Sequence, residues 1–165
     1  MLSTQRIRTI NDESINVIKD VAGIEASIQP QDAWACKTIK DMLSQEGVEL
    51  LIVVECTQEE KQRVVGYCLY QLLFEQAEIL RIGTHPCYQR RGIASQLFFE
   101  VNKELQSKEV MSLLLEVRED NTPAIALYKQ QGFAIIHRRH NYYQTLHQPS
   151  IDALVMELSY IVNPK

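Results

Sequence analysis

Residues 89–94 form the stretch whose residue types are best suited to holding a phosphate group. The stretch reads Gln-Arg-Arg-Gly-Ile-Ala and joins an apolar, strand-like run at 78–84 to an amphipathic helical pattern at 93–105. The first N–H groups of a helix have no intrahelical partner, and the helix dipole places partial positive charge beside them. Gly92 lets the backbone approach a ligand closely, and the two arginines add positive charge. The pattern predicts a phosphate site, although an ordinary solvated turn would use the same residues.

Glu116 is the residue that could accept a proton in a catalytic step. It lies within the run 111–118, whose other members are mostly apolar. A carboxylate in such a strand needs a physical reason, because burying an unpaired charge is costly. It is either half of a structural ion pair, with Arg118 as the nearby candidate, or a base held ready for proton transfer. Periodicity alone slightly favours the structural pair.

Tyr128 and Asn121 carry two further polar groups with two readings each. Tyr128 lies two helical turns after Asn121 and could pack in the core beside Ile125, a common outcome for a tyrosine at such spacing. Its phenol could equally donate a proton to a leaving group. Asn121 precedes Pro123 and could cap a helix, bind a ligand or do both.

A set of strands and helices must position these residues. Hydrophobic periodicity and turn residues predict strands at 7–10, 49–56, 64–74, 76–84, 111–118, 134–143 and 153–159, and helices at 12–28, 34–43, 93–108 and 122–131. The order β-α-α-β-β-β-α-β-α-β-β predicts an α/β fold with a mixed, mostly antiparallel central sheet flanked by helices. The near-continuous apolar run at 111–118 is typical of a strand covered on both faces.

Length and composition place the chain among ordinary globular proteins. Its 165 residues fit a single domain over 1–165, with 45% hydrophobic and 23% charged residues. The formal net charge of -4 gives no reason to expect direct binding to nucleic acid or to an anionic membrane. The polar N-terminal segment has no apolar signal core, and no apolar run approaches the roughly 20 residues that span a bilayer. We therefore expect a cytoplasmic protein.

The cysteines and histidines give no sign of a metal site. The four cysteines form no C-x-x-C pair, and we expect all of them to be reduced. The four histidines lack ligand spacing and acidic companions, so we interpret them as surface or structural residues. No metal is expected.

The loop, the element order and several motifs together resemble the GNAT superfamily of N-acetyltransferases. Residues 89–94 match its strand, Gln/Arg-x-x-Gly-x-Gly/Ala, helix pattern, and they lack the further glycines of a dinucleotide fingerprint and the Gly-Lys-Ser/Thr of a P-loop. The motifs L-E-V-R (115–118), N-x-x-A-I-x-L-Y (121–128), G-F (132–133), R-R-x-N-Y-Y (138–143) and D-A-L-V-M (152–156) resemble one branch, the RimI-type ribosomal-protein alanine N-acetyltransferases. The resemblance covers roughly residues 5–160 and is strongest from 80 to 156.

The resemblance implies roles for individual residues. Acetyl-CoA would be the co-substrate, and the residues in contact with it would be Ile82, Gly83, Thr84, Arg90, Arg91, Gly92, Ile93, Ala94, Ser95 and Asn121. Glu116 matches the position of the family's proton acceptor, and Tyr128 matches the donor that protonates the departing CoA thiolate. The resemblance thus reverses the preference for a structural ion pair at Glu116.

The implied acceptor is the N-terminal α-amine of a protein, in this branch the N-terminal alanine of a small-subunit ribosomal protein. The implied partners are therefore acetyl-CoA and a ribosomal-protein N-terminus. A protein α-amine has a pKa of about 8 and a lysine side chain one of about 10.4, so the base has the easier task with an N-terminus. Segment 138–143 would lie near the peptide-binding side. One departure concerns the acceptor: family members usually carry Phe-Pro-Trp where this chain has Pro30-Gln-Asp-Ala-Trp34.

Two other interpretations stay open. The same chemistry could act on another protein N-terminus, a lysine or a small amine, which an acceptor screen would separate. The chain could instead be a non-catalytic acyl-CoA-binding module. The presence of Glu116, Tyr128 and Asn121 together with the loop argues against such a module, because binding alone needs only the loop.

Overall fold

The computed structural model describes residues 1–8, 10–56, 62–144 and 146–160. In chain order the elements are β1 (Leu2–Ile7), α1 (Asp12–Ile28), α2 (Cys36–Leu43), β2 (Val48–Cys56), β3 (Gln62–Leu73), β4 (Gln76–Thr84), the 3-10 helix η1 (Pro86–Tyr88), α3 (Ile93–Ser107), β5 (Ser112–Arg118), α4 (Thr122–Gln130), β6 (Ala134–Tyr143) and β7 (Ile151–Ser159). Apart from η1, this is the order of helices and strands that the sequence predicts.

Hydrogen bonding orders the strands as β1-β2-β3-β4-β5-β7-β6. β1 and β2, β2 and β3, β5 and β7, and β6 and β7 pair antiparallel, whereas β4 and β5 pair parallel. The predicted α/β fold with a mixed, mostly antiparallel sheet is therefore confirmed. None of the helices in the described segments combines the length and apolar character needed to cross a membrane.

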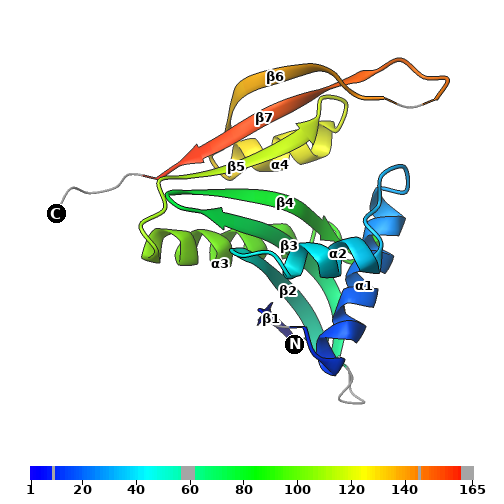
Figure 1. The fold of residues 1–165 in the computed structure, drawn as a ribbon, viewed down its shortest axis with the longest axis vertical. Coiled ribbons are helices and arrows are strands. Elements are labelled where there is room, and N and C mark those ends of the chain that lie inside the picture. The colour runs from blue at the N-terminus through cyan, green and yellow to red at the C-terminus, as the bar shows by residue number, and fades with distance from the viewer. Residues whose placement is uncertain (9, 57–61, 145, 161–165) are drawn as a thin grey trace. The chain divides into compact units, whose positions relative to one another are not determined.

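The chain divides into two compact units, which we describe separately (Figure 1). The first contains Met1–Gln71 and Arg81–Lys103, and the second contains Leu72–Leu80 and Glu104–Lys165. The first therefore holds β1, α1, α2, β2, the loop after β4 and the start of α3. The second holds the start of β4 together with β5, α4, β6 and β7. The single domain expected over 1–165 stays a prediction.

The start of α1 explains why the first strand lies earlier than predicted. Asn11 caps the helix: its side chain accepts a hydrogen bond from the Ser14 N–H, and the Ser14 hydroxyl accepts one from the Asn11 N–H. This reciprocal capping box fixes the chain just before Asp12 as a helix start. Of the strand predicted at 7–10, Ile7 ends β1 (Leu2–Ile7), Arg8 and Ile10 lie outside it, and residue 9 is outside the described residues. β1 pairs with β2 from Leu2↔Glu55 to Ile7↔Leu50.

The core of the first unit lies between its strands and helices. Ile18, Val21 and Ile24 form the buried stripe of α1, and α2 lies along α1 and β2 (Figure 1). On the start of α3, the buried stripe includes Ile93, Leu97 and Phe98. A Cβ on Gly66 would come within 2.3 Å of Ile93 Cγ2, so the glycine in β3 permits the close approach of α3.

The core of the second unit forms on one face of β5. Leu113, Leu115 and Val117 are buried, whereas Leu114, Glu116 and Arg118 are partly exposed. Successive strand residues point to opposite faces, so the second set shares one face. β5 is thus not covered equally on its two faces, contrary to the expectation from its apolar run. The partly exposed face is the one that carries Glu116.

Candidate active site

The predicted phosphate loop lies in the first unit and leads directly into α3. Arg90 and Gly92 have φ angles of 61° and 79°, in the left-handed region. The Gln96 N–H donates to the Gly92 carbonyl over 2.9 Å, so α3 begins immediately after this glycine. A Cβ at Gly92 would meet nothing within 4 Å, and Arg90, Arg91 and Gly92 are exposed. The loop therefore offers an open backbone at a helix start, with two cations beside it, as binding of a phosphate requires.

Neighbouring residues hold the loop in this shape. The guanidinium of Arg91 lies 5.0 Å from the centre of the Tyr88 ring, and the Tyr88 hydroxyl donates to Glu55. The His85 N–H donates to the Val65 carbonyl over 2.9 Å, and His85 Nδ1 accepts from the Cys87 N–H at the start of η1. His85 thus has a structural role, as the sequence predicts.

The remaining predicted cofactor contacts continue from the loop along the chain. Ile93 is buried, Ala94 is half-buried and Ser95 is exposed in the first turn of α3. Ile82, Gly83 and Thr84 are the last residues of β4. A Cβ on Gly83 would come within 2.5 Å of Ile28 Cδ1 and within 2.8 Å of the Tyr67 hydroxyl. Packing inside the first unit therefore already requires glycine at this position.

Glu116 lies on β5 in the second unit, with its side chain 21% exposed. Its Oε1 is 3.0 Å from Nη1 of Arg139 on β6. Arg118, which the sequence suggested as the partner, binds Asp120 through Nε at 3.0 Å and Nη2 at 2.8 Å. Arg139 was not predictable as the partner of Glu116, because their proximity arises from the β5-β7-β6 pairing. Glu116 is thus a partly exposed carboxylate, held by one half-exposed arginine.

Asn121 and Tyr128 lie at the start and near the end of α4. The Asn121 side chain accepts a hydrogen bond from the Ala124 N–H over 3.3 Å, so the predicted capping role is confirmed. Tyr128 is 8% exposed, and its ring contacts Phe133 at a centroid distance of 6.0 Å. The ring of Tyr128 therefore packs in the core. The role of its hydroxyl as a proton donor stays a prediction.

Glu78 is an acidic residue of this unit that sequence analysis missed. It lies on β4 opposite Leu114 of β5, two residues before Glu116. Burial raises the pKa of the Glu78 carboxyl, the charge of Glu116 raises it further, and the charge of Arg139 opposes both effects. The available signal was a glutamate between Ala77 and Ile79 in an apolar strand, but its neighbours become evident only from the β4–β5 register.

A second acidic residue that sequence analysis missed is Glu25 on α1, which is fully buried in the first unit. It accepts hydrogen bonds from the Tyr67 hydroxyl and, over 3.1 Å, from the backbone N–H of Trp34. Burial, followed by the Glu25 charge, raises the pKa of the Tyr67 hydroxyl well above its ordinary value. Arg81 Nε lies 3.9 Å from Glu25, and its guanidinium is 4.7 Å from the centre of the Trp34 ring.

These contacts hold the segment between α1 and α2, where the chain departs from the family's Phe-Pro-Trp pattern. Arg81 also lies 3.4 Å from an Asp32 carboxylate oxygen and donates to the Asp32 carbonyl over 3.2 Å. The helix predicted from Trp34 begins only at Cys36, because Ala35 has an extended backbone and is the N-cap, whose carbonyl accepts from the Ile39 N–H over 3.1 Å. The Trp34 N–H, ahead of this cap, donates to Glu25. Glu25 and Arg81 therefore hold the segment between α1 and α2 in place through their contacts with Asp32 and Trp34.

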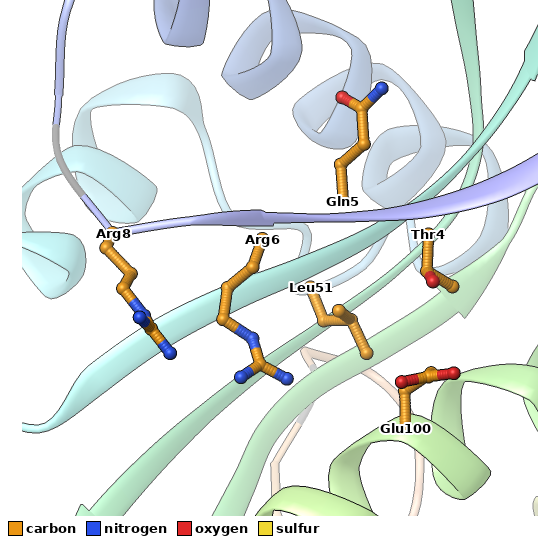
Figure 2. Close-up of a pocket in the computed structure, with 6 residues that line it drawn as sticks. All are labelled: Thr4, Gln5, Arg6, Arg8, Leu51 and Glu100. Carbon is orange, nitrogen blue, oxygen red and sulfur yellow. The ribbon is translucent and has the colours of Figure 1, made fainter.

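An open groove of about 510 Å³ in the first unit is separate from all these residues. Figure 2 shows Thr4, Arg6 and Arg8 extending from one side of β1 and Gln5 from the other. Both arginines approach Glu49, at 3.5 and 3.6 Å. None of the sequence-predicted site residues lines this groove. Among the described residues, no group of three or more His, Cys, Asp or Glu side chains could hold a metal ion.

Comparisons with known proteins agree with this arrangement. The sequence model of the acetyltransferase (GNAT) family matches residues 22–133. The chain is 34% identical over 125 residues to the [Ribosomal protein bS18]-alanine N-acetyltransferase of Escherichia coli K12, covering 76% of this chain and 80% of that protein. It is 38% identical over 96 residues to the Salmonella typhimurium protein of the same name, covering 58% of this chain and 64% of that protein.

Solved structures give the same picture. The crystal structure of the ribosomal-protein-S18-alanine N-acetyltransferase from Escherichia coli matches with a TM-score of 0.82 and 26% identity, covering 100% of this chain and 97% of that one. The fold is also that of Arabidopsis thaliana NAA60 in complex with acetyl-CoA, with a TM-score of 0.78, 19% identity and coverage of 96% and 98%. By its sequence and its fold, this chain belongs to the GNAT family of acetyltransferases.

Proposed function

We propose that this protein transfers the acetyl group of acetyl-CoA to the N-terminal α-amine of a protein, and that the acceptor is the N-terminal alanine of ribosomal protein bS18. The observation that carries the proposal is Glu116, a carboxylate on a partly exposed strand face in a chain whose relatives bear that activity in their names. The acceptor amine must lose a proton before it attacks a thioester, and a carboxylate can take that proton directly or through one water.

The phosphate loop suits the co-substrate. A CoA thioester carries phosphate groups, and Arg90 and Arg91 supply cations beside the exposed start of α3. Gly92 leaves space where a side chain would otherwise stand. We assign contacts with acetyl-CoA to these residues together with Ile82, Gly83, Thr84, Ile93, Ala94, Ser95 and Asn121.

The chemistry has a defined proton balance. Glu116 takes one proton from the acceptor ammonium and passes it to solvent, and the neutral amine attacks the thioester carbonyl. The carbon–sulfur bond then breaks, and the attacking nitrogen loses its second proton to solvent as the amide forms. Tyr128 gives a proton to the departing thiolate and regains one from solvent. A phenol has a pKa of about 10 and a thiol one of about 8.5, so this transfer depends on the position of the Tyr128 hydroxyl. An α-amine with a pKa of about 8 is already neutral in about a tenth of molecules at pH 7, which suits a carboxylate base.

The test is acetyl transfer to a short peptide that begins with the N-terminal alanine of bS18. Release of free CoA and the mass of the peptide are followed together, and the control is the same peptide with a blocked N-terminus and an internal lysine. We expect one acetyl group on the free α-amine and none on the control. Acetylation of the control, or transfer only to other amines, would assign a different acceptor. If the protein binds acetyl-CoA but transfers the acetyl group to no amine, the result would favour a non-catalytic acyl-CoA-binding module.

A further inference from the structure

Glu78 and Glu116 lie on the same face of the second unit. Glu78 is paired with Leu114 across the parallel β4–β5 ladder, and Glu116 follows Leu114 by two residues. Residues in register share a face, and so do residues two apart on one strand. With strands about 4.8 Å apart and a rise of about 3.3 Å per residue, the two Cα atoms lie roughly 8 Å from each other. Two glutamate side chains extending from such positions can approach one ligand from two sides.

The two residues also flank the end of the β4–β5 ladder. The paired register runs from Gln76↔Ser112 to Ile79↔Leu115. Glu78 is in the next-to-last pair, and Glu116 is the first residue of β5 after the last pair. The carboxyls therefore lie where the two strands stop bonding to each other.

Charge in this place is only partly compensated. Arg139 lies 3.0 Å from Glu116 and acts electrostatically on Glu78, so this guanidinium faces two carboxyls. Arg118, on the same face of β5, is paired with Asp120. Taking the proposed acetyl transfer as the basis, we propose that Glu78 binds the protonated α-amine of the acceptor beside Glu116, so that the acceptor site is a pair of carboxyls. The cation that completes the charge balance is the substrate itself.

The division of labour follows from the chemistry of the amine. With a pKa of about 8, an N-terminal amine arrives at neutral pH mostly as an ammonium ion with three N–H donors. Hydrogen bonds from an ammonium to carboxylates are among the stronger polar contacts in proteins. Glu78 holds the ammonium in place, and Glu116 takes the proton that must leave before attack. Glu78 is thus a residue for acceptor binding, and its loss affects affinity more than the chemical step.

Glu157 on β7 supplies a matched comparison. It is paired with Leu114 from the other side, so Glu78 and Glu157 flank the same residue on the same face. Glu157 lies within the continuous β5-β7-β6 ladder, where it is also paired with Ala134. The other charged or titratable residues on this face include Glu116, Arg118, Arg139 and His137; Arg118 and Arg139 both lie opposite Ala153 of β7, and His137 lies opposite Val155. Glu157 therefore shares with Glu78 the face and the neighbour Leu114, but it lies away from the end of the β4–β5 ladder.

The experiment compares Glu78→Gln and Glu157→Gln with the wild-type enzyme on the alanine peptide. For Glu78→Gln we expect the peptide KM to rise about tenfold or more, with kcat within about threefold and the acetyl-CoA KM unchanged. The N-acetylated peptide has no ammonium, so it should inhibit wild type and Glu78→Gln with equal inhibition constants. Glu157→Gln should leave all these values unchanged. If Glu78 had only a structural role, Glu78→Gln would weaken binding of the free-amine peptide and of the N-acetylated peptide alike. The comparison of the two peptides therefore separates ammonium binding from a structural effect.

The pH dependence gives a second readout. A carboxylate binds an ammonium only while charged, so the wild-type peptide KM should rise as pH falls through the raised pKa of Glu78. In Glu78→Gln the acid-side rise should be weaker. An unchanged peptide KM in Glu78→Gln on a peptide that the wild type does acetylate would overturn the assignment of Glu78 and leave the proposed function intact.

The remaining outcomes concern the acceptor and the fold. If the wild type uses a different amine, the bS18 assignment fails and the same comparison on that amine decides the role of Glu78. If the wild type acetylates no amine, the proposed function and the role of Glu78 fail together. Loss of folding in Glu78→Gln, read by circular dichroism, shifts the comparison to Glu78→Asp, which keeps the charge and should bind the peptide better than Glu78→Ala. Equal peptide KM values in those two variants would contradict the proposal.

Discussion

Glu25 in the first unit and the Glu78–Glu116 pair in the second are both acidic centres in apolar surroundings, but their charges are compensated differently. Glu25 is 0% exposed and is held by a hydroxyl, a backbone N–H and an arginine. Glu116 is 21% exposed, and Arg139 faces both it and Glu78. The first centre is complete without a ligand, whereas the second has capacity for a cation. Burial of a carboxylate alone therefore does not identify a catalytic site; incomplete compensation on an accessible face is the more informative sign.

The largest effect should come from Glu116→Gln. The amide keeps the shape of the side chain but cannot take a proton, so we expect kcat/KM for the alanine peptide to fall about 10²- to 10⁴-fold. Because Arg139 is 48% exposed, the lost ion pair should cost no more than about 1 kcal/mol of unfolding free energy. Steady-state kinetics and urea unfolding measure the two quantities, with acetyl-CoA affinity as the control. Full activity in the variant would remove Glu116 from the role of base.

Glu25→Ala should have the opposite effect to Glu116→Gln: a large loss of stability rather than of catalytic activity. The change leaves Arg81, the Tyr67 hydroxyl and the Trp34 N–H without the carboxylate that binds them, and removing one member of a buried ion pair costs about 3–5 kcal/mol. We expect that loss in the free energy of unfolding, measured by urea denaturation. Glu25→Gln retains an acceptor for Tyr67 and should lose less. If Glu25→Ala were as stable as the wild type but failed to turn over, Glu25 would belong to the chemistry and the contrast between the two centres would disappear.

Arg139→Gln tests the partial compensation itself. Arg139 lowers the pKa of Glu78 against burial and Glu116, so its loss should raise that pKa further. A raised carboxyl pKa means that the negative charge is lost at a higher pH as pH falls. The acid-side rise in peptide KM should therefore move to higher pH, with an increase of up to about fivefold near pH 6 and little change at pH 8. Identical KM–pH profiles in variant and wild type would show that Arg139 does not tune the acceptor site.

Local signals predicted most of the fold. The helix at 12–28 and the strand at 76–84 match the structure at both ends, since asparagine, proline and turn residues mark their limits. Errors arose where tertiary contacts override local pattern. β1 is a polar strand whose position depends on pairing with β2, and the extended segment before α2 is held by the Trp34 N–H bond to Glu25. Neither contact can be predicted from a short stretch of sequence, because each joins residues from different elements.

In the candidate site, too, the features set by local sequence were predicted and those set by tertiary contacts were not. Residues 89–94 and Glu116 were evident from residue type and spacing, because a donor-rich helix start and a charge in an apolar strand are local features. Glu78 and Arg139 were not evident, since they approach Glu116 only through the registers of β4, β5, β7 and β6. A site assembled across a sheet is therefore predicted only in the part that each strand carries alone.

The smallest effect should appear at the phosphate loop, where the charges are most exposed. Arg91 is positioned by its contact with Tyr88, yet its guanidinium stays in solvent, so Arg91→Gln should weaken acetyl-CoA binding only about two- to fivefold at low salt. At 1 M salt the screening length is about 3 Å, and the difference should nearly vanish. Lys37→Gln on α2 is the matched control, because Lys37 is an exposed cation paired with Asp41. Isothermal titration with acetyl-CoA at both salt concentrations separates the two readings of residues 89–94: a salt-dependent loss confined to Arg91→Gln supports a phosphate site, and equal affinities in both variants leave an ordinary solvated turn.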